Sequence, residues 1–140
     1  MKHDLALLFF RLTFGCTLAF AHGLPKIEDF ANLSSTFADP LGVGPFVSLS
    51  LVVFAEFFCA LCVAIGFATR FAAITVLINM VVILGMVHLD DPFAKKEMPL
   101  LFAAAFAFFV FEGGGRFSFD HLLQKAGLIK SKRLTTTRAY

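Results

Sequence analysis

The sequence predicts an all-α integral membrane protein whose main part is a bundle of four membrane-spanning helices. Hydrophobic residues make up 59% of the 140-residue chain and charged residues only 16%, and a soluble domain of this length cannot bury so much apolar surface. The apolar residues also occur in long runs, as expected for helices that cross a bilayer with roughly 17–25 residues. Four runs fit this description: residues 5–24, 45–67, 71–88 and 96–112.

The first run, residues 5–24, carries Arg11 inside its apolar stretch. Lys2 before the run and small residues near its end imitate a secretory signal, but such signals seldom hold an internal charge, so we expect a retained helix. Arg11, Gly15 and His22 share one helix face because they follow at i, i+4 and i+11. Gly15 on that face predicts a close approach of a neighbouring helix.

The segment between the first and second runs is amphipathic. Ile27, Phe30 and Leu33 recur at helical spacing with polar residues between them. This spacing predicts a short helix that lies on the outer membrane surface. The dipeptide Asp39-Pro40 then breaks the chain before the second run begins.

The later connections are short or rich in glycine. The turn Gly66–Thr69 between the second and third runs predicts that these two helices are antiparallel neighbours. After the three glycines at 113–115, residues 118–130 place apolar residues on one side. This pattern predicts an interfacial helix whose N-terminus is capped by Ser118 or Asp120.

The distribution of basic residues predicts the orientation. The side of the membrane that holds both termini carries most of the lysines and arginines, while the other side holds only Lys26, Lys95 and Lys96. Cytoplasmic loops carry the excess of basic residues, so both termini are expected in the cytoplasm. We divide the chain into a transmembrane domain, residues 1–120, and an amphipathic basic tail, residues 121–140, which would lie near anionic headgroups.

Polar residues inside the predicted spans need partners, because an ionisable group at membrane depth costs about 2.5–3.5 kcal/mol on insertion scales. Arg11 lies in the first span and Glu56 near the middle of the second. The two side chains either pair, or Arg11 extends to the interface while Glu56 is protonated or hydrogen-bonded. Asn79 in the third span is expected to form an interhelical hydrogen bond rather than to contact a substrate.

Four polar residues are expected at the outer ends of the spans, where they would form a shallow pocket: His22, Lys26, His88 and Glu97. Their ligand types suit a metal, but they lack the local spacing of a metal site, so we predict none. The alternative is that each residue simply lies at the membrane interface.

Cys59 and Cys62 form a Cys-x-x-Cys pair three and six residues after Glu56. Thiol oxidoreductases stabilise the thiolate with a helix N-terminus or a cation, whereas apolar surroundings and a nearby carboxylate disfavour it. Small thiols that fill an apolar helix interface are therefore preferred over a redox pair, which stays the secondary hypothesis.

The order and spacing of several motifs resemble the DoxX family of small four-helix membrane proteins. The motifs are Leu8-Phe9-Phe10-Arg11-Leu12 with Gly15, Ala21-His22-Gly23-Leu24-Pro25-Lys26, Glu56 followed by Gly66-Phe67-Ala68-Thr69-Arg70, and Gly113-Gly114-Gly115-Arg116-Phe117-Ser118-Phe119-Asp120. The resemblance implies a multi-pass protein of the bacterial cytoplasmic (inner) membrane with an association with redox chemistry of sulfur compounds and thiols.

Two functions from different classes fit these observations. In the first, the chain is a quinone-linked oxidoreductase or the membrane subunit of one, and Arg11, Glu56 and the outer polar residues bind a quinone and move protons. In the second, it is a non-catalytic scaffold that docks a partner, and the polar residues only hold helices together. The sequence has no motif for another cofactor and none for nucleic acid. The expected partners are the lipid bilayer and either a second subunit or further copies of this chain.

Overall fold

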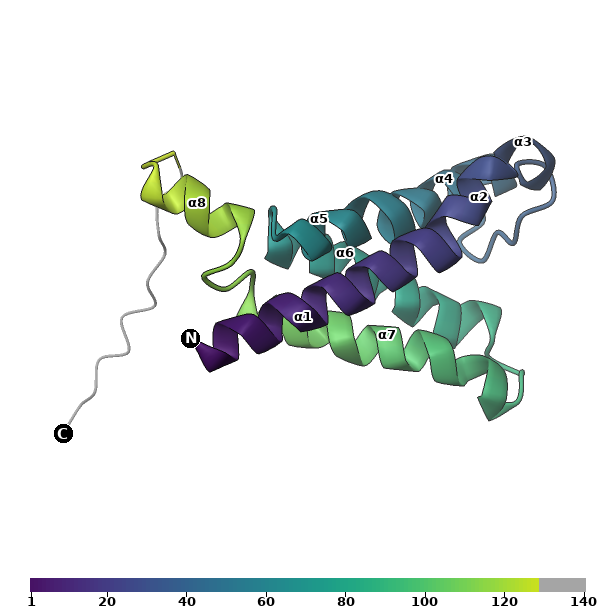
Figure 1. The fold of residues 1–140 in the computed structure, drawn as a ribbon. Coiled ribbons are helices and arrows are strands. Elements are labelled where there is room, and N and C mark those ends of the chain that lie inside the picture. Colours follow the sequence, from purple (N-terminus) through teal and green to yellow (C-terminus); the bar gives the residue numbers. More distant parts are fainter. Residues whose placement is uncertain (129–140) are drawn as a thin grey trace, which may run out of the picture.

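Residues 1–128 are described in a computed structural model of the chain, and every regular element among them is helical. The helices join into four long rods that lie side by side (Figure 1). The first rod consists of α1 (Lys2–Thr17), η1 (Leu18–Gly23) and α2 (Leu24–Glu28), and α3 (Phe30–Leu33) follows it. The second rod consists of α4 (Pro45–Val53), η2 (Phe54–Cys59) and α5 (Ala60–Ile65). The third consists of α6 (Thr69–Val82) and η3 (Ile83–Val87), the fourth is α7 (Phe93–Glu112), and α8 (Phe119–Lys125) is a short helix beyond it.

Three of the rods are long and apolar enough to cross a membrane: Lys2–Glu28, Pro45–Ile65 and Thr69–Val87. The fourth rod, α7, has 20 residues, but Lys95, Lys96 and Glu97 lie in its first turns, so its uninterrupted apolar stretch is shorter. The predicted class, an all-α membrane protein, is confirmed. That α7 is a fourth membrane span stays a prediction.

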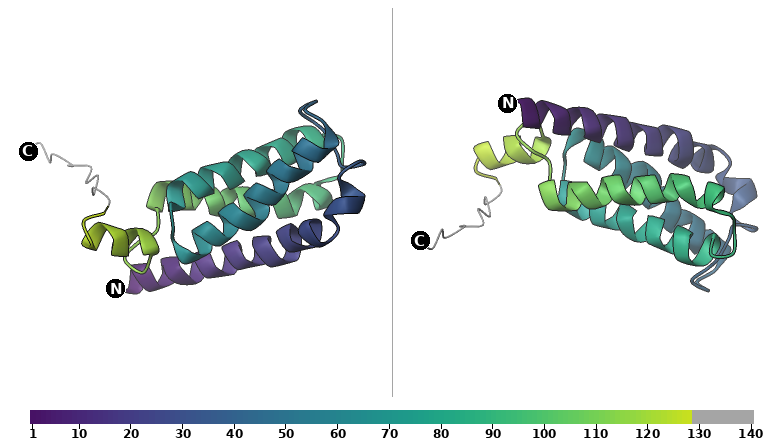
Figure 2. Two further views of the ribbon diagram at one scale, coloured as in Figure 1. Left: turned by 90° about the horizontal axis from the view of Figure 1, so that it is seen from above. Right: turned by 90° about the horizontal axis from the view of Figure 1, so that it is seen from below.

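The two ends of the bundle differ in what they carry. The N-terminus, the turn between α5 and α6, and α8 lie at one end, which we call the α8 end (Figure 2). The connection from the first to the second rod, with α3, and the connection from η3 to α7 lie at the opposite end, the α3 end (Figure 1). The interior between these ends is apolar, with fully buried Leu18, Val63, Val76, Phe106 and Phe109.

Two glycines allow the first rod to pack directly against the second. A Cβ atom at Gly15 would lie 2.7 Å from the Ala60 carbonyl oxygen and 2.8 Å from the Ala64 Cβ. A Cβ atom at Gly23 would lie 2.8 Å from the Glu56 carbonyl oxygen. Real Cβ atoms do not approach so closely, so these positions require glycine at this helix separation. The close approach predicted at Gly15 is confirmed, and the two contacts fix the antiparallel register of the rods.

The α8 end is closed by hydrogen bonds between segments that are distant in sequence. The Asp120 carboxylate accepts from the Ala68 amide at 2.7 Å, the Thr69 amide at 3.0 Å and the Thr69 hydroxyl at 2.8 Å. It thereby caps the N-terminus of α6 from a position 51 residues further along the chain. The Ser118 hydroxyl accepts from the His121 amide at 3.2 Å and caps α8. Of the two predicted caps of α8, Ser118 holds that role and Asp120 serves α6.

The predicted short helices are present in reduced form. The amphipathic segment between the first two spans contains α3, which has only four residues, because Asp29 interrupts the helix before it and the turn at 34–36 ends it. The predicted interfacial helix at 118–130 corresponds to α8, which ends at Lys125. Most of the predicted basic tail, residues 129–140, lies outside the described residues.

Candidate functional site

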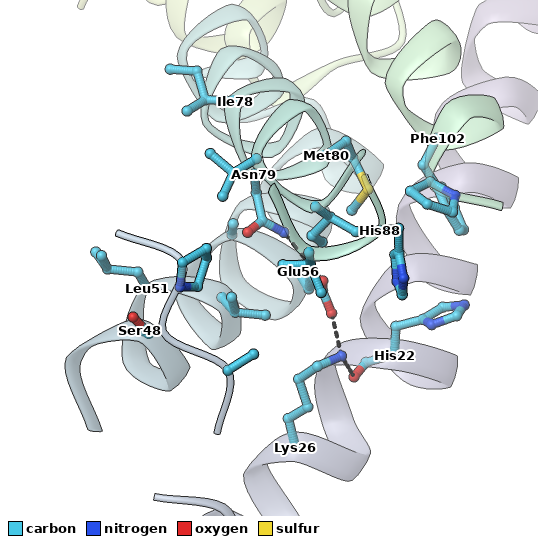
Figure 3. Close-up of a pocket in the computed structure, with 18 of the residues that line it drawn as sticks. His22, Lys26, Ser48, Leu51, Glu56, Ile78, Asn79, Met80, His88 and Phe102 are labelled. Carbon is cyan, nitrogen blue, oxygen red and sulfur yellow. Dashed lines mark hydrogen bonds and ion pairs between the residues drawn. The ribbon is translucent and has the colours of Figure 1, made fainter. Parts of the chain in front are cut away.

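A cavity of about 590 Å³ lies between the rods in the half of the bundle toward the α3 end. Its volume falls in the range of small-molecule sites, roughly 300–1,000 Å³. Most of its walls are apolar side chains from all four rods and from the loop before α4. A few polar side chains interrupt this lining: His22, Lys26, Ser48, Glu56, Thr75, Asn79, His88 and Lys95 (Figure 3).

Three rods change their helical winding where they border the cavity. The segments η1, η2 and η3 have wider, π-type turns, and each contributes to the lining, with His22, Glu56 and Ile83 among the residues involved. A π-type turn inserts an extra residue per turn and re-aims the side chains that follow it, and such turns are frequent at functional sites. The widened winding thus occurs at one level of the bundle and supplies polar residues of the site.

The Glu56 carboxylate is the buried centre of the polar lining. Lys26 Nζ donates to Glu56 Oε2 at 2.6 Å, and Asn79 Nδ2 donates to Glu56 Oε1 at 3.1 Å. The two donors approach from opposite sides, from the first and the third rod (Figure 3). The Glu56 side chain is only 4% exposed, and both of its oxygens have partners. The expected interhelical bond of Asn79 is confirmed, although Asn79 also lines the cavity.

Lys26 presents its ammonium group to the cavity with one donor to spare. Besides the bond to Glu56, Lys26 Nζ donates to the His22 carbonyl oxygen at 2.9 Å. An ammonium has three N–H donors, and two of them have partners among the described residues. The third is left for a ligand in the cavity that Lys26 lines. Asn79 likewise uses its Nδ2 on Glu56, which leaves its carbonyl oxygen as an acceptor at the same wall.

The two histidines complete the polar lining on the side of α7. The His22 ring packs edge-on against Phe102 of α7, with 5.6 Å between ring centroids. His88 Nδ1 lies 2.8 Å from Asp91 Oδ2, and Lys95 Nζ lies 2.9 Å from Asp91 Oδ1. The hydrogen bonds from His88 and Lys95 lower the pKa of Asp91 below its usual value. This cluster holds the η3–α7 connection against the cavity.

The loop before α4 covers the cavity at the α3 end. Phe37, Pro40 and Leu41 of this loop line the cavity. Asp39 holds the loop in place: its carboxylate accepts from the Ser48 hydroxyl at 2.7 Å and from the amides of Gly44 and Val43 at 2.7 and 3.0 Å. The bond from Ser48, together with those amides, lowers the pKa of Asp39. These bonds therefore fix the loop as a roof over this end of the cavity.

The expected alternative of an Arg11–Glu56 pair is wrong. Arg11 is fully buried at the α8 end, where its Nη2 donates to the Phe117 carbonyl oxygen at 2.6 Å. Gly23 packs directly against the backbone of Glu56. Arg11 lies twelve residues before Gly23 on the first rod, which corresponds to about 18 Å. Arginine does not reach across this distance. The Arg11 Nε and Nη1 atoms are buried without a partner among the described residues, and Nη1 lies against Gly66.

The remaining candidate residues do not join the cavity lining. Glu97 is exposed on α7 and is not part of the lining, so the expected outer set reduces to His22, Lys26 and His88. Cys59 is buried in the core and Cys62 is half-buried, and both are free thiols. Neither cysteine lines the cavity. The redox pair therefore stays a secondary hypothesis, and the two thiols lie outside the candidate site. Among the described residues, no group of three or more His, Cys, Asp or Glu side chains is placed to hold a metal.

Several residues of the site were not identified from the sequence. Lys95, Met98, Pro99 and Phe102 line the cavity from one stripe of α7 at i, i+3, i+4 and i+7. Glu97 points to the opposite side of that helix, which explains its absence. The stripe is readable in the sequence once the helix boundaries are known. The pairing of Lys26 with Glu56 has no comparable local signal, because it depends on the register between two rods.

The fold and the site define a class: a multi-pass helical membrane protein with an apolar cavity and a buried, charged polar centre. The chain belongs to the DoxX family, whose sequence model matches residues 6–89 and thus spans the first three rods. Searches of curated proteins and of solved structures returned no match. The match of the family model confirms the family that the sequence motifs suggested.

Proposed function

We propose that the cavity binds the head group of a quinone and that the chain is a quinone-linked oxidoreductase of the bacterial inner membrane or the membrane subunit of one, with both termini in the cytoplasm. The observation that supports this proposal is the Lys26 ammonium, held by the Glu56 carboxylate at 2.6 Å in a mostly apolar cavity with one N–H donor to spare. A quinone carbonyl is an acceptor on an apolar ring and matches this combination of donor and wall.

The polar centre also suits the proton chemistry of a quinone. Conversion of a quinone to a quinol takes up two electrons and two protons at the carbonyl oxygens. Lys26 Nζ is the donor that would bond one such oxygen, and Glu56 stabilises the charge on Lys26. The His22 ring lies at the same wall of the cavity and offers ring nitrogens as further hydrogen-bonding groups.

The electrons would come from a thiol or another reduced sulfur compound, directly or through a partner subunit. With a thiol donor the reaction balances: two thiols are oxidised to one disulfide, and their two electrons and two protons convert one quinone to one quinol. This choice of reductant follows the redox association that the family resemblance implies.

The scaffold alternative predicts a different arrangement of hydrogen bonds among the buried polar groups. A scaffold needs only packed helices, and its buried polar groups would use all their hydrogen bonds on one another. Within residues 1–128, Lys26 keeps an unused donor and Asn79 an unused acceptor at the wall of a cavity. This arrangement favours ligand binding over a packing role.

Calorimetric titration of the protein in lipid nanodiscs with a quinone tests the proposal. Lys26→Met removes the donor and is expected to weaken binding by about tenfold to a hundredfold, because a hydrogen bond from a charged group contributes about 1.5–3 kcal/mol. Lys96→Met is the matched control, since Lys96 lies at the same end but donates to the Leu89 carbonyl oxygen outside the cavity. Absence of quinone binding by the wild-type protein, or equal affinity of the Lys26→Met variant, would refute the proposal.

A further inference from the structure

We propose that the cavity is open sideways to the bilayer between the second and third rods, and that it selects a ligand with a long hydrocarbon chain, which enters by this route and leaves its chain in the opening. We call this opening the lateral portal and define it by Leu51 and Phe54 on the second rod and Ile78 on the third. The inference rests on the proposed quinone site for the head group and adds the route and the chain.

The residues of the lateral portal belong to the cavity and to the outer surface of the bundle at once. Leu51, Phe54 and Ile78 all line the cavity, yet they are 50%, 47% and 59% exposed. Their exposed sides lie on rods that are long and apolar enough to span a membrane. A cavity whose rim consists of such residues opens to lipid and not to water.

Leu41, Val87 and Met98 also line the cavity and are 52%, 39% and 51% exposed, so the other sides of the cavity are only partly covered. The loop held by Asp39 covers the α3 end with Phe37, Pro40 and Leu41. Met80 and Phe102 form the wall opposite the lateral portal, and both are buried. We take the gap between the second and third rods as the route of entry because both of these rods are long and apolar enough to span a membrane. Leu41, in contrast, belongs to the loop held by Asp39, and Met98 follows the charged first turns of α7.

The arrangement of the rods explains why this gap exists. In the third rod, α6 packs against α5 and η2 of the second rod and also against α7. Beyond these contacts, α4 and η3 diverge toward the α3 end (Figure 1). The divergence opens the two rods at the level of Ile78, next to the Glu56 centre.

The extent of the apolar wall indicates what the ligand carries besides its head group. The third rod lines the cavity from Thr75 to Val87, and twelve residues of helix correspond to about 18 Å. The polar centre of Lys26, Glu56 and Asn79 occupies a small part of that length. A head group alone would leave most of the apolar wall uncovered, whereas an attached chain would cover it and continue into lipid.

Two quinones that share a head group and differ in the chain test the inference: 2,3-dimethoxy-5-methyl-1,4-benzoquinone and the same compound with a ten-carbon chain. Binding is measured in nanodiscs and expressed per mole fraction of quinone in the membrane, which removes the effect of partitioning. Ile78→Trp places a large side chain in the lateral portal. It is expected to weaken binding of the chain-bearing quinone at least tenfold and to change binding of the chainless quinone less than twofold.

Matched variants separate blocking from general damage. Ile74→Trp lies one turn away on the same exposed face of α6 but outside the lining, and it should affect neither quinone. Leu51→Trp and Val47→Trp form an equivalent pair on α4. If Ile78→Trp and Leu51→Trp leave the chain-bearing quinone unaffected or weaken both quinones equally, the lateral portal is refuted while the quinone site stands. If the wild-type protein binds neither quinone, both proposals fall.

Discussion

The Lys26–Glu56 pair is expected to couple the first and second rods strongly, and a double-mutant cycle measures that coupling. Glu56 is 4% exposed and Lys26 is 24% exposed. Removal of one partner of a buried ion pair costs about 3–5 kcal/mol, because the other charge stays buried without compensation. The partial exposure of Lys26 to the cavity places the present pair at the lower end of that range.

The three variants of the cycle differ in which charged groups stay buried without their partner. Lys26→Met leaves the Glu56 carboxylate with Asn79 alone and should cost about 3 kcal/mol. Glu56→Gln leaves Lys26 with the His22 carbonyl oxygen and access to the cavity, and it should cost about 2 kcal/mol. The double variant buries no charge and should cost about 2 kcal/mol, because the amide introduced by Glu56→Gln still pairs with Asn79. The resulting coupling energy is about 3 kcal/mol.

The assay is reversible unfolding in mixed micelles with increasing sodium dodecyl sulfate, at constant pH and lipid composition. The Lys95–Asp91 pair is the internal control, since its atoms are 2.9 Å apart but Lys95 is 61% exposed. Lys95→Met with Asp91→Asn should yield a coupling energy of at most about 1 kcal/mol. If the costs of Lys26→Met and Glu56→Gln add to within about 0.5 kcal/mol, the pair does not couple the rods and the reasoning fails.

Three further predictions concern the parts that hold the site in place. Gly15→Ala should destabilise the protein by about 1–3 kcal/mol, because the new Cβ meets Ala60 and Ala64. Gly85→Ala is the control: nothing lies within 4 Å of that position, so the substitution should be neutral or stabilising by up to about 1 kcal/mol in the same assay. Equal effects of the two substitutions would contradict the packing argument. Asp120→Ala should cost about 1–2 kcal/mol through loss of the α6 cap, whereas the exposed Asp90→Ala should cost less than about 0.5 kcal/mol. The stability of the loop that covers the cavity should depend on pH. Because the pKa of Asp39 is lowered, the stabilisation by its carboxylate is complete above about pH 4 and is lost as the pH falls through the lowered pKa. Amide hydrogen exchange at Val43 and Gly44 measures this loss, and exchange that follows the same pH profile in Asp39→Asn would refute it.

The helices and several of their contacts could be predicted from the sequence because their causes are local. Runs of apolar residues predicted the three helices that are long and apolar enough to cross a membrane, and the glycine at 15 predicted a close helix contact. A hydroxyl before an amphipathic segment predicted the cap at Ser118. An amide in an apolar helix has few ways to satisfy its hydrogen bonds, and this predicted the interhelical bond of Asn79.

The polar pairing could not be predicted because it depends on the register of two rods. Counting from the expected helix starts placed Arg11 within reach of Glu56. The contacts of Gly15 and Gly23 shift the first rod so that Lys26 takes that place. The first rod also continues past the expected end at 24 to Glu28, which keeps Lys26 within the bundle. The π-type turns of η1 and η2 have no distinct residue pattern, so the re-aimed side chains had no sequence signal.

The distribution of polar groups between the two ends indicates where this protein meets its ligand. At the α8 end, the carboxylate of Asp120 and the hydroxyl of Ser118 are committed to backbone groups, and Arg11 is enclosed by Gly66 and Phe117. The bonds of Asp120 and Arg11 join segments far apart in the chain, and Arg11 does not line the cavity. At the α3 end, Lys26 and Asn79 share one carboxylate and each keeps hydrogen-bonding capacity toward the cavity. The capacity of Lys26 and Asn79 faces a cavity large enough for a small molecule, whereas the Arg11 Nε and Nη1 atoms, which have no partner among the described residues, are enclosed by packed protein outside that cavity. The α3 end is therefore the part of the fold that is organised for binding, and the α8 end is the part that holds the rods in register for it.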